Sequence, residues 1–453
     1  MEIQAQGKHR LSGMLGFSLV WVGQIVSVLA SGMTTFAMTI YMYQQTKSAT
    51  AMGLVQVAYI TPFLLMSPVA GVMVDRYNRK LMMMVSDVAG GTATLALFLL
   101  YVTGHLQYWH IYVTSAVAGL GTTFQWPAYS AAISVMLPKD QYGRANGMMS
   151  LIEAGPGVVS PFLAGSLLPF IQIGGILLLD TITFWIAIMA LAIVFVPQPA
   201  STVEGDESRG GFWKEAAFGF RYIFARPSLL GLQMVFFFGN LFSGIGFAVL
   251  APMMLARTAQ NTIALGSVES AISIGMVVGG IGMSAWGGFK RRVHGVLLGW
   301  MFSSLGANIL FGLAHSLPVW IATIFIGGLF VPLVNASNQA IWQAKVAPDL
   351  QGRVFSARRL IAWFTNPISP IIGGTMADFV LEPAMRAGNS PVAQLFGPIF
   401  GTGPGSGMSL LIFLCGIGAF FVGLAGYFIP AIRDAESVLP DHEAGPASEP
   451  APA

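Results

Sequence analysis

The sequence has very few charged residues for its length. Only 9% of its 453 residues are Asp, Glu, Lys or Arg, whereas 55% are apolar. A soluble domain usually carries about 25% charged residues, so this chain has too little polar surface for a water-soluble globule. Together with the mean hydropathy of +0.70, the composition predicts a protein that crosses a lipid bilayer several times.

Further absences argue against several function classes. The single cysteine, Cys415, excludes an intrachain disulfide. No G-x-x-x-x-G-K-[ST] sequence occurs, which argues against direct use of ATP. There is no H-E-x-x-H, no metal-spaced histidine cluster and no candidate catalytic triad. We therefore expect no catalytic residue, no metal and no cofactor, and predict that the protein is not an enzyme.

Long apolar runs predict the spans. A transmembrane helix needs roughly 20 apolar residues, and about twelve runs of that length occur. We therefore predict an all-α membrane protein of twelve transmembrane helices. The predicted segments are 15–43, 50–74, 81–103, 109–136, 144–170, 172–196, 228–256, 265–288, 294–314, 318–344, 355–380 and 408–430.

The basic residues predict the orientation. With the N-terminus in the cytoplasm, all of the 22 Lys and Arg residues except Lys47, Arg257 and Arg386 fall on the cytoplasmic side. Such asymmetry follows the positive-inside rule. We expect a multi-pass protein of the plasma (inner) membrane with both termini cytoplasmic.

An internal repeat predicts two halves. Ser160-Pro-Phe-Leu-Ala-Gly165 resembles Ser369-Pro-Ile-Ile-Gly-Gly374, and a second pair of matching segments has the same offset of 209 residues. The predicted organisation is a six-helix bundle in each half of the chain. Its parts are residues 1–196, a cytoplasmic linker at 197–227, residues 228–433 and a disordered cytoplasmic tail at 434–453.

Two motifs carry a family resemblance. The stretch from Gly71 to Lys80, with Asp75, Arg76 and Arg79 between them, resembles the loop between helices 2 and 3 of major facilitator superfamily transporters. The Gly-Pro block of predicted helix 5 is similar to a motif of exporters in that superfamily. Its residues are Gly155, Pro156, Gly157, Pro161 and Gly165.

With these motifs the chain resembles the drug:proton antiporter group that includes enterobactin exporters and macrolide and multidrug efflux pumps. It differs from many of them in having no Arg in predicted helix 4. The resemblance implies a secondary active transporter that exports amphipathic organic molecules, of drug, macrolide or siderophore type, by alternating access. The proton gradient would be its energy source. The expected partners are a small-molecule substrate, protons and the lipid bilayer, with no nucleic acid, and the expected state is a monomer.

The motif from Gly71 to Lys80 has two interpretations. By the resemblance, Asp75 would meet the N-terminus of predicted helix 11, near Gly352 to Phe355, and would form a cytoplasmic gate. The partial positive charge of a helix N-terminus favours an acid there. Alternatively, the basic residues of this loop only determine topology.

Three acids lie inside predicted spans, at Asp87, Glu153 and Asp180. An acid near the centre of a span costs at least ~2.5 kcal/mol and is a functional candidate by default. No Lys or Arg lies at comparable depth in the predicted segments. We predict that these acids couple transport to protons, the alternative being that each only hydrogen-bonds a neighbouring helix.

Polar and aromatic residues in the middle of spans are candidates for a substrate cavity, because such side chains suit an amphipathic ligand. Lipid contact or helix packing explains each of them equally well. The candidates are Gln24, Trp126, Tyr129, Asn240, Asn335, Asn338 and Asn366.

Other functions remain open at this point. A major facilitator importer or a lysophospholipid flippase would share the same fold. A membrane-embedded enzyme or an assembly factor would belong to another class, but the sequence offers no catalytic cluster for it.

Overall fold

The computed structural model describes residues 13–76, 78–137, 142–196, 219–346 and 348–438. Within these ranges every regular element is a helix. The predicted all-α fold is therefore confirmed for the described part of the chain.

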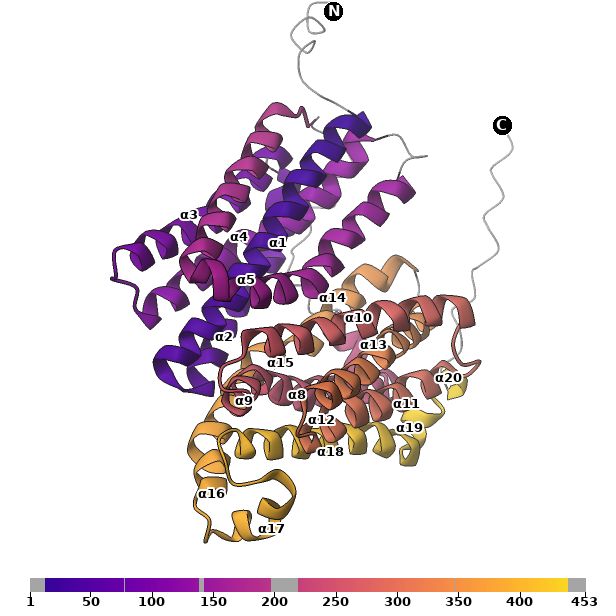
Figure 1. Cartoon of the computed structure of the whole chain (residues 1–453). Helices are drawn as coiled ribbons and strands as arrows, with labels where there is room; N and C mark the ends of the chain where they lie inside the picture. Colours follow the sequence, from indigo (N-terminus) through magenta and orange to yellow (C-terminus); the bar gives the residue numbers. More distant parts are fainter. Residues whose placement is uncertain (1–12, 77, 138–141, 197–218, 347, 439–453) are drawn as a thin grey trace, which may run out of the picture.

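Five helices form the N-terminal half (Figure 1). They are α1 (Gly13–Thr46), α2 (Ala49–Arg76), α3 (Arg79–Val102), α4 (Tyr108–Met136) and α5 (Tyr142–Ile193). Helix α5 contains two helical segments that meet at Gln172, whose φ of 56° is non-helical. Such a φ is uncommon for a residue other than glycine. The break falls between the predicted segments 144–170 and 172–196.

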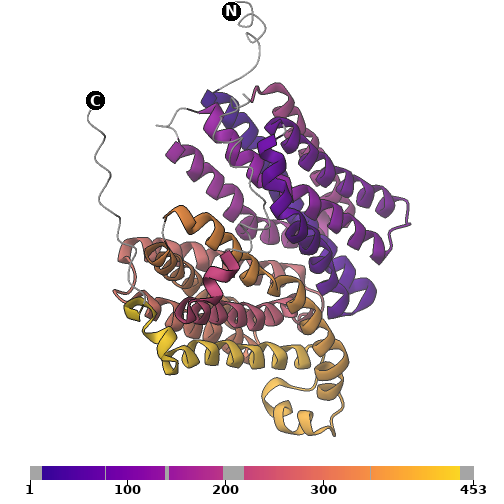
Figure 2. The ribbon, with the colours of Figure 1, turned by 180° about the vertical axis from the view of Figure 1, so that it is seen from behind.

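The C-terminal half contains the remaining helices (Figures 1 and 2). Two of its long helices contain a π-helical turn, at η2 and η3. The elements are α8 (Pro227–Ala248), α9 (Leu250–Arg257), α10 (Thr262–Trp286), α11 (Arg292–Ser304), η2 (Leu305–Leu310), α12 (Phe311–Leu313), α13 (Leu317–Lys345), α14 (Pro348–Trp363), α15 (Thr365–Thr375), η3 (Met376–Leu381), α16 (Glu382–Arg386), α17 (Pro391–Phe400), α18 (Ser406–Phe428), α19 (Pro430–Arg433) and α20 (Ala435–Val438).

In the described residues, nine helical stretches are long and apolar enough to cross a bilayer. One of them, Gly155–Ile193, contains the break at Gln172. The structure confirms a multi-pass helical protein, and the exact number of twelve spans stays a prediction.

Two boundaries differ in detail from the predicted segments. Residues 219–224, in the predicted linker, are helical. Helix α20 lies at the start of the predicted disordered tail. Arg291 pairs with Asp434 there at 3.1 Å, and the amide of Val293 donates to Glu436. Residues 197–218 and 439–453 lie outside the described part of the chain.

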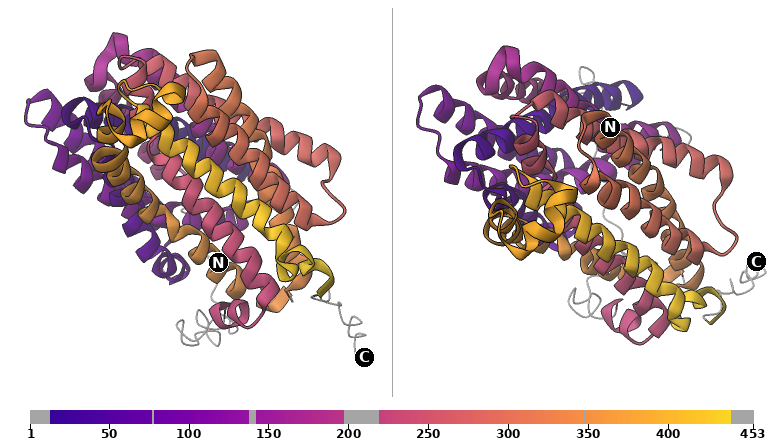
Figure 3. Two further views of the ribbon diagram at one scale, coloured as in Figure 1. Left: turned by 90° about the horizontal axis from the view of Figure 1, so that it is seen from below. Right: turned by 60° about the horizontal axis from the view of Figure 1, so that its bottom comes forward.

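The two halves lie side by side (Figures 1 and 3), and two helix pairs join them. Helix α5 packs against α10, and α2 packs against α15. We call the end of the molecule that carries Thr46–Ala49 and α16 the α16 end. By the distribution of basic residues, this is the predicted external end.

The apolar core shows where the halves are joined. The largest buried cluster draws on both halves, with Ile40 from α1, Leu265 from α10 and Ala377 from η3. Smaller clusters around Phe17 and around Trp300 each belong to one half. The shared core includes the residues that flank the α16 end, so the halves are held together there.

Residues of the sequence repeat make matching contacts. The Ser160 hydroxyl donates to the Leu29 carbonyl at 2.8 Å, and the Ser369 hydroxyl donates to the Leu241 carbonyl at 3.3 Å. Each bond joins the fifth or eleventh predicted helix to the first helix of its own half. The repeat is therefore visible in the packing as well as in the sequence.

Close helix packing leaves no room for a side chain at Gly119. A methyl group on Gly119 of α4 would overlap the Tyr59 carbonyl of α2, whereas Gly90 of α3 has open space beside it. We predict that Gly119→Ala destabilises the protein by about 1–3 kcal/mol through overpacking and lowers its melting temperature in detergent. Gly90→Ala is the matched control and should be neutral or stabilising, because alanine favours helix. Equal melting temperatures for the two variants would contradict this packing.

Candidate functional site

Asp87 lies in a buried network of three helices. It is only 6% exposed on α3. One carboxylate oxygen accepts a hydrogen bond from Gln24 of α1 at 2.8 Å, and the other accepts one from Gln125 of α4 at 2.8 Å. The Gln125 amide also donates to the Gln24 side-chain oxygen at 2.6 Å. Both oxygens of the acid are thus satisfied by neutral amide groups.

The groups around this network are apolar or neutral. Tyr129 is buried and stacks on Phe17, with ring centroids 5.7 Å apart. The hydroxyls of Tyr129 and Ser86 are buried without a hydrogen-bond partner among the described residues. No Lys or Arg in the described part of the chain forms an ion pair with Asp87. These two hydroxyls, close to a buried acid, can each form a further hydrogen bond at this site.

Asp180 is the second buried acid, with 1% exposure on α5. Its two oxygens accept hydrogen bonds from Ser31 of α1 at 2.9 Å and from Thr94 of α3 at 3.0 Å. These donors are also neutral. As with Asp87, the described residues supply no cation to it.

The two acids share the helices that hold them. Gln24 and Ser31 lie seven residues apart on α1, and Asp87 and Thr94 lie seven residues apart on α3. Seven residues correspond to two helical turns, or about 10 Å along the axis. Side chains of α1 and α3 therefore contribute to two acid sites at two depths, and Asp180 of α5 is nearer the α16 end.

Several predicted residues have side chains outside the described part of the structure. They are Gly71, Asp75, Arg76, Trp126 and Glu153. The predicted gate contact of Asp75 and the coupling role of Glu153 therefore stay predictions.

Lys80 has a structural contact that the sequence did not reveal. Its ammonium group donates to the carbonyls of Ala192 and Val194 at 2.8 and 2.7 Å. A cation there satisfies carbonyls at the C-terminal end of α5. Arg79 is the first residue of α3. Lys80 thus joins the predicted gate motif to the end of α5.

The Gly-Pro block of α5 faces the other half of the molecule in part. A methyl group on Gly157 would lie 3.1 Å from the Ser273 hydroxyl, and one on Gly165 would lie 2.6 Å from the Thr262 carbonyl. Both neighbours belong to α10. Gly155 has no such neighbour, and Pro156 and Pro161 lie within the helix.

The predicted cavity residues do not form one described cluster. Gln24 belongs to the Asp87 network, near Tyr129. Asn338 is buried and accepts a hydrogen bond from Trp342 of its own helix at 2.9 Å. The other three are Asn240, which is half-buried, and Asn335 and Asn366, which are exposed. Sequence reasoning missed Gln125, Ser31 and Thr94, although each is a polar residue inside an apolar run.

Comparisons with known proteins agree with this architecture. Residues 20–360 match the Major Facilitator Superfamily. Macrolide efflux protein A of Streptococcus pyogenes is 25% identical over 372 residues, which cover 80% of this chain and 90% of that protein. Enterobactin exporter EntS of Shigella flexneri is 24% identical over 345 residues, 75% of this chain and 79% of that protein.

Multidrug efflux pump Tap of Mycolicibacterium fortuitum is 23% identical over 377 residues, covering 80% of this chain and 88% of the pump. Among solved structures, an inward-facing bacterial homolog of the human lysosomal transporter Spinster superposes with a TM-score of 0.67. It is 16% identical and covers 92% of this chain and 98% of that one. At this identity the likeness shows the fold alone.

The Asp87 network predicts energetic coupling between its members. We expect Asp87→Leu and Gln125→Leu each to lower the melting temperature, because each removes a partner from a buried hydrogen bond, at about 1–3 kcal/mol. The double variant should lose less than the sum of the two, since one bond is lost only once. Thermal unfolding of the four proteins measures this. Strictly additive losses would show that the two side chains do not interact.

Proposed function

This chain belongs to the Major Facilitator Superfamily of membrane transporters, which are not enzymes, and we propose that it exports amphipathic organic molecules in exchange for protons. The observation that carries the proposal is the burial of Asp87 and Asp180 among neutral donors, without a cation, in the described residues. Drug, macrolide and siderophore molecules are the proposed substrates, because relatives along most of the chain are named for macrolide, multidrug and enterobactin export.

The physical reason for proton coupling lies in the cost of burying charge. An ionised carboxylate in an apolar environment is expensive unless it is paired. Neutral hydroxyl and amide donors offset only part of that cost. A carboxyl group whose access to water changes between two conformations therefore binds a proton in one of them and releases it in the other. Asp87 and Asp180 are proposed to act in this way, with Glu153 as a third candidate.

Alternating access is proposed to use the two helix pairs that join the halves. At the α5–α10 contact Gly165 approaches Thr262, and at the α2–α15 contact Gly374 approaches Thr50. Small residues allow helix backbones to come close and to slide or separate. With the α16 end as the external end, the described conformation is closed outside. Separation of the helices at these contacts would open that end and release substrate.

The number of spans, the topology, the membrane and the oligomeric state predicted from the sequence belong to the same proposal. We propose twelve spans in two six-helix bundles, both termini in the cytoplasm, a place in the plasma (inner) membrane and a monomeric state. We also propose that Gln24 and Tyr129, in the N-terminal half, belong to a substrate cavity. Together they provide an amide and a large aromatic surface. Such a combination suits a bulky amphipathic molecule.

The test is proton flux in proteoliposomes that contain the purified protein under an imposed pH gradient. Macrolides, cationic dyes and catecholate siderophores are added one at a time. We expect at least one class to cause proton movement, and Asp180→Asn or Asp87→Asn to reduce that movement by tenfold or more, because an amide does not titrate. Glu153→Gln is tested in parallel.

Asp434→Asn is the matched control, since Asp434 is an acid between α19 and α20 that pairs with Arg433 and Arg291. It should leave proton flux unchanged. If no compound moves protons while a labelled lipid or solute still crosses the membrane, the proposal of proton-coupled export fails.

A further inference from the structure

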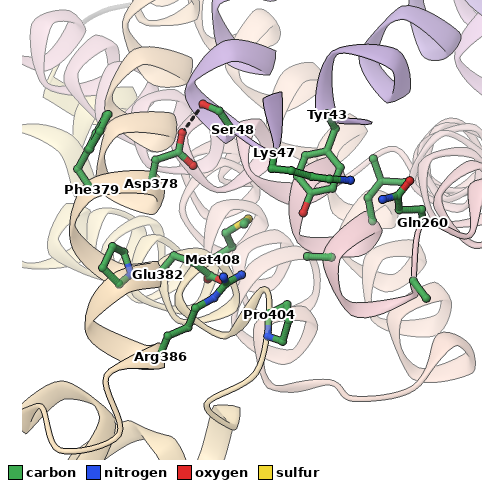
Figure 4. Close-up of a pocket in the computed structure, with 14 residues that line it drawn as sticks. Tyr43, Lys47, Ser48, Gln260, Asp378, Phe379, Glu382, Arg386, Pro404 and Met408 are labelled. Carbon is green, nitrogen blue, oxygen red and sulfur yellow. Dashed lines mark hydrogen bonds and ion pairs between the residues drawn. The ribbon is translucent and has the colours of Figure 1, made fainter. Parts of the chain in front are cut away.

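Asp378 connects the two halves at the α16 end (Figure 4). It lies in η3 of the C-terminal half, and its partners lie at the start of α2 in the N-terminal half. One carboxylate oxygen accepts a hydrogen bond from the Ala49 amide at 3.0 Å. The other accepts bonds from the Thr50 amide at 2.9 Å and from the Ser48 hydroxyl at 2.6 Å. Three hydrogen bonds thus cross the interface to one carboxylate.

This carboxylate completes the cap of α2. The first amides of a helix have no partner within the helix. At α2 the Ser48 hydroxyl oxygen accepts from the Ala51 amide at 3.1 Å, and Asp378 accepts from the two amides before it. An acid is also favoured here by the partial positive charge of a helix N-terminus. One of these three amides is therefore capped locally, by Ser48, and two are capped by Asp378 from the other half of the protein.

The backbone packing around Asp378 depends on the same closed arrangement. A methyl group on Gly374 would overlap Thr50, and one on Gly53 would lie 2.8 Å from the Pro370 carbonyl. These contacts place the helix that carries Asp378 directly against the start of α2. If the halves separated at this end, the Ala49 and Thr50 amides would lose the carboxylate.

The pseudo-symmetric position in the other helix pair is built differently. Helix α10 is capped by its own Asn261, which accepts from the Ala264 amide at 3.0 Å. Thr262 donates to the Gly165 carbonyl at 2.9 Å. At the repeat offset, the residue that corresponds to Asp378 is Pro169, which cannot accept through its side chain. The crossing cap is thus specific to the α2 side of the interface.

Asp378 and Ser48 line a cavity at the α16 end, and the other charged groups of this cavity have partners of their own. The cavity has a volume of about 920 Å³ and is also lined by Tyr43, Lys47, Glu382 and Arg386. Lys47 lies over the Tyr43 ring at 5.3 Å. Glu382 accepts from the Gly405 and Gly407 amides at 2.6 and 2.9 Å and pairs with Arg386 at 2.9 Å. Glu382 therefore bonds only within the C-terminal half.

We propose that Asp378 is the outer gate residue of this transporter, a detachable cap of α2 that sets the balance between the closed and open forms of the α16 end. Opening breaks all three of its bonds across the interface and leaves two helix amides to water. The inference rests on the alternating access of the proposed function. It assigns a positioning role to an acid that neither the gate motif nor the buried acids include.

The experiment measures the opening of the α16 end directly, without added substrate and without a pH gradient. Spin labels are attached at His105→Cys and Asn389→Cys, two exposed positions of the α16 end on opposite halves, in a Cys415→Ala background. Double electron–electron resonance gives the ratio of long to short distances. We expect Asp378→Asn and Asp378→Ala to raise that ratio about five- to thirtyfold, the range expected for losing charge-assisted bonds at a helix N-terminus.

Glu382→Gln is the matched control, because it removes the charge of a carboxylate four residues away that makes no bond across the interface. It should leave the ratio close to that of the unsubstituted protein. An unchanged ratio in both Asp378 variants, or an equal rise in Glu382→Gln, would overturn the proposal. Should the Asp378 variants fail to fold, Ser48→Ala removes one crossing bond and should still raise the ratio.

The outcomes separate this inference from the proposed function. A raised ratio in the Asp378 variants together with no proton flux in any liposome assay would leave the gate in place and reject proton coupling. Proton-coupled export with an unchanged ratio would reject the gate alone.

Discussion

The absence of water from the bilayer core is the constraint on which the rest of this structure depends. A polar group in that environment must find its partner within the protein. Asp87 and Asp180 meet the requirement with amides and hydroxyls from α1, α3 and α4. At the α16 end, outside that core, the first amides of α2 bond to an acid from the opposite half. The contacts that satisfy these polar groups are therefore also those that the proposed transport cycle would have to break and remake.

The fold was accessible from the sequence because its signals are local and periodic. Apolar runs and the break near Gln172 follow from composition, and the repeat is visible in Ser160 and Ser369, which make matching bonds. The position of Asp87 and Asp180 inside spans was also predictable, since each acid interrupts a long apolar run.

The partners of these acids were not predictable from one sequence. Gln125 lies 38 residues from Asp87, and Asp378 lies 328 residues from Thr50. Nothing in local spacing indicates which helix faces which, because helix rotation and tilt are determined by packing. Asp378 also lies near the end of an apolar run, where an acidic residue is usually exposed to solvent. Lys80 was recognised as part of a basic loop, but its bonds to the end of α5 depend on the fold.

The spacing of the two acid sites along α1 and α3 has an electrical consequence. The hydrocarbon core is about 30 Å thick, and two helical turns span about 10 Å, roughly a third of it. A proton that passed from the level of Asp180 to that of Asp87 would cross about a third of the membrane potential. In the proposed orientation, with the cytoplasmic side negative, this amounts to ~0.8 kcal/mol at 100 mV, so the voltage would favour proton transfer from Asp180 to Asp87 even without a difference in pH.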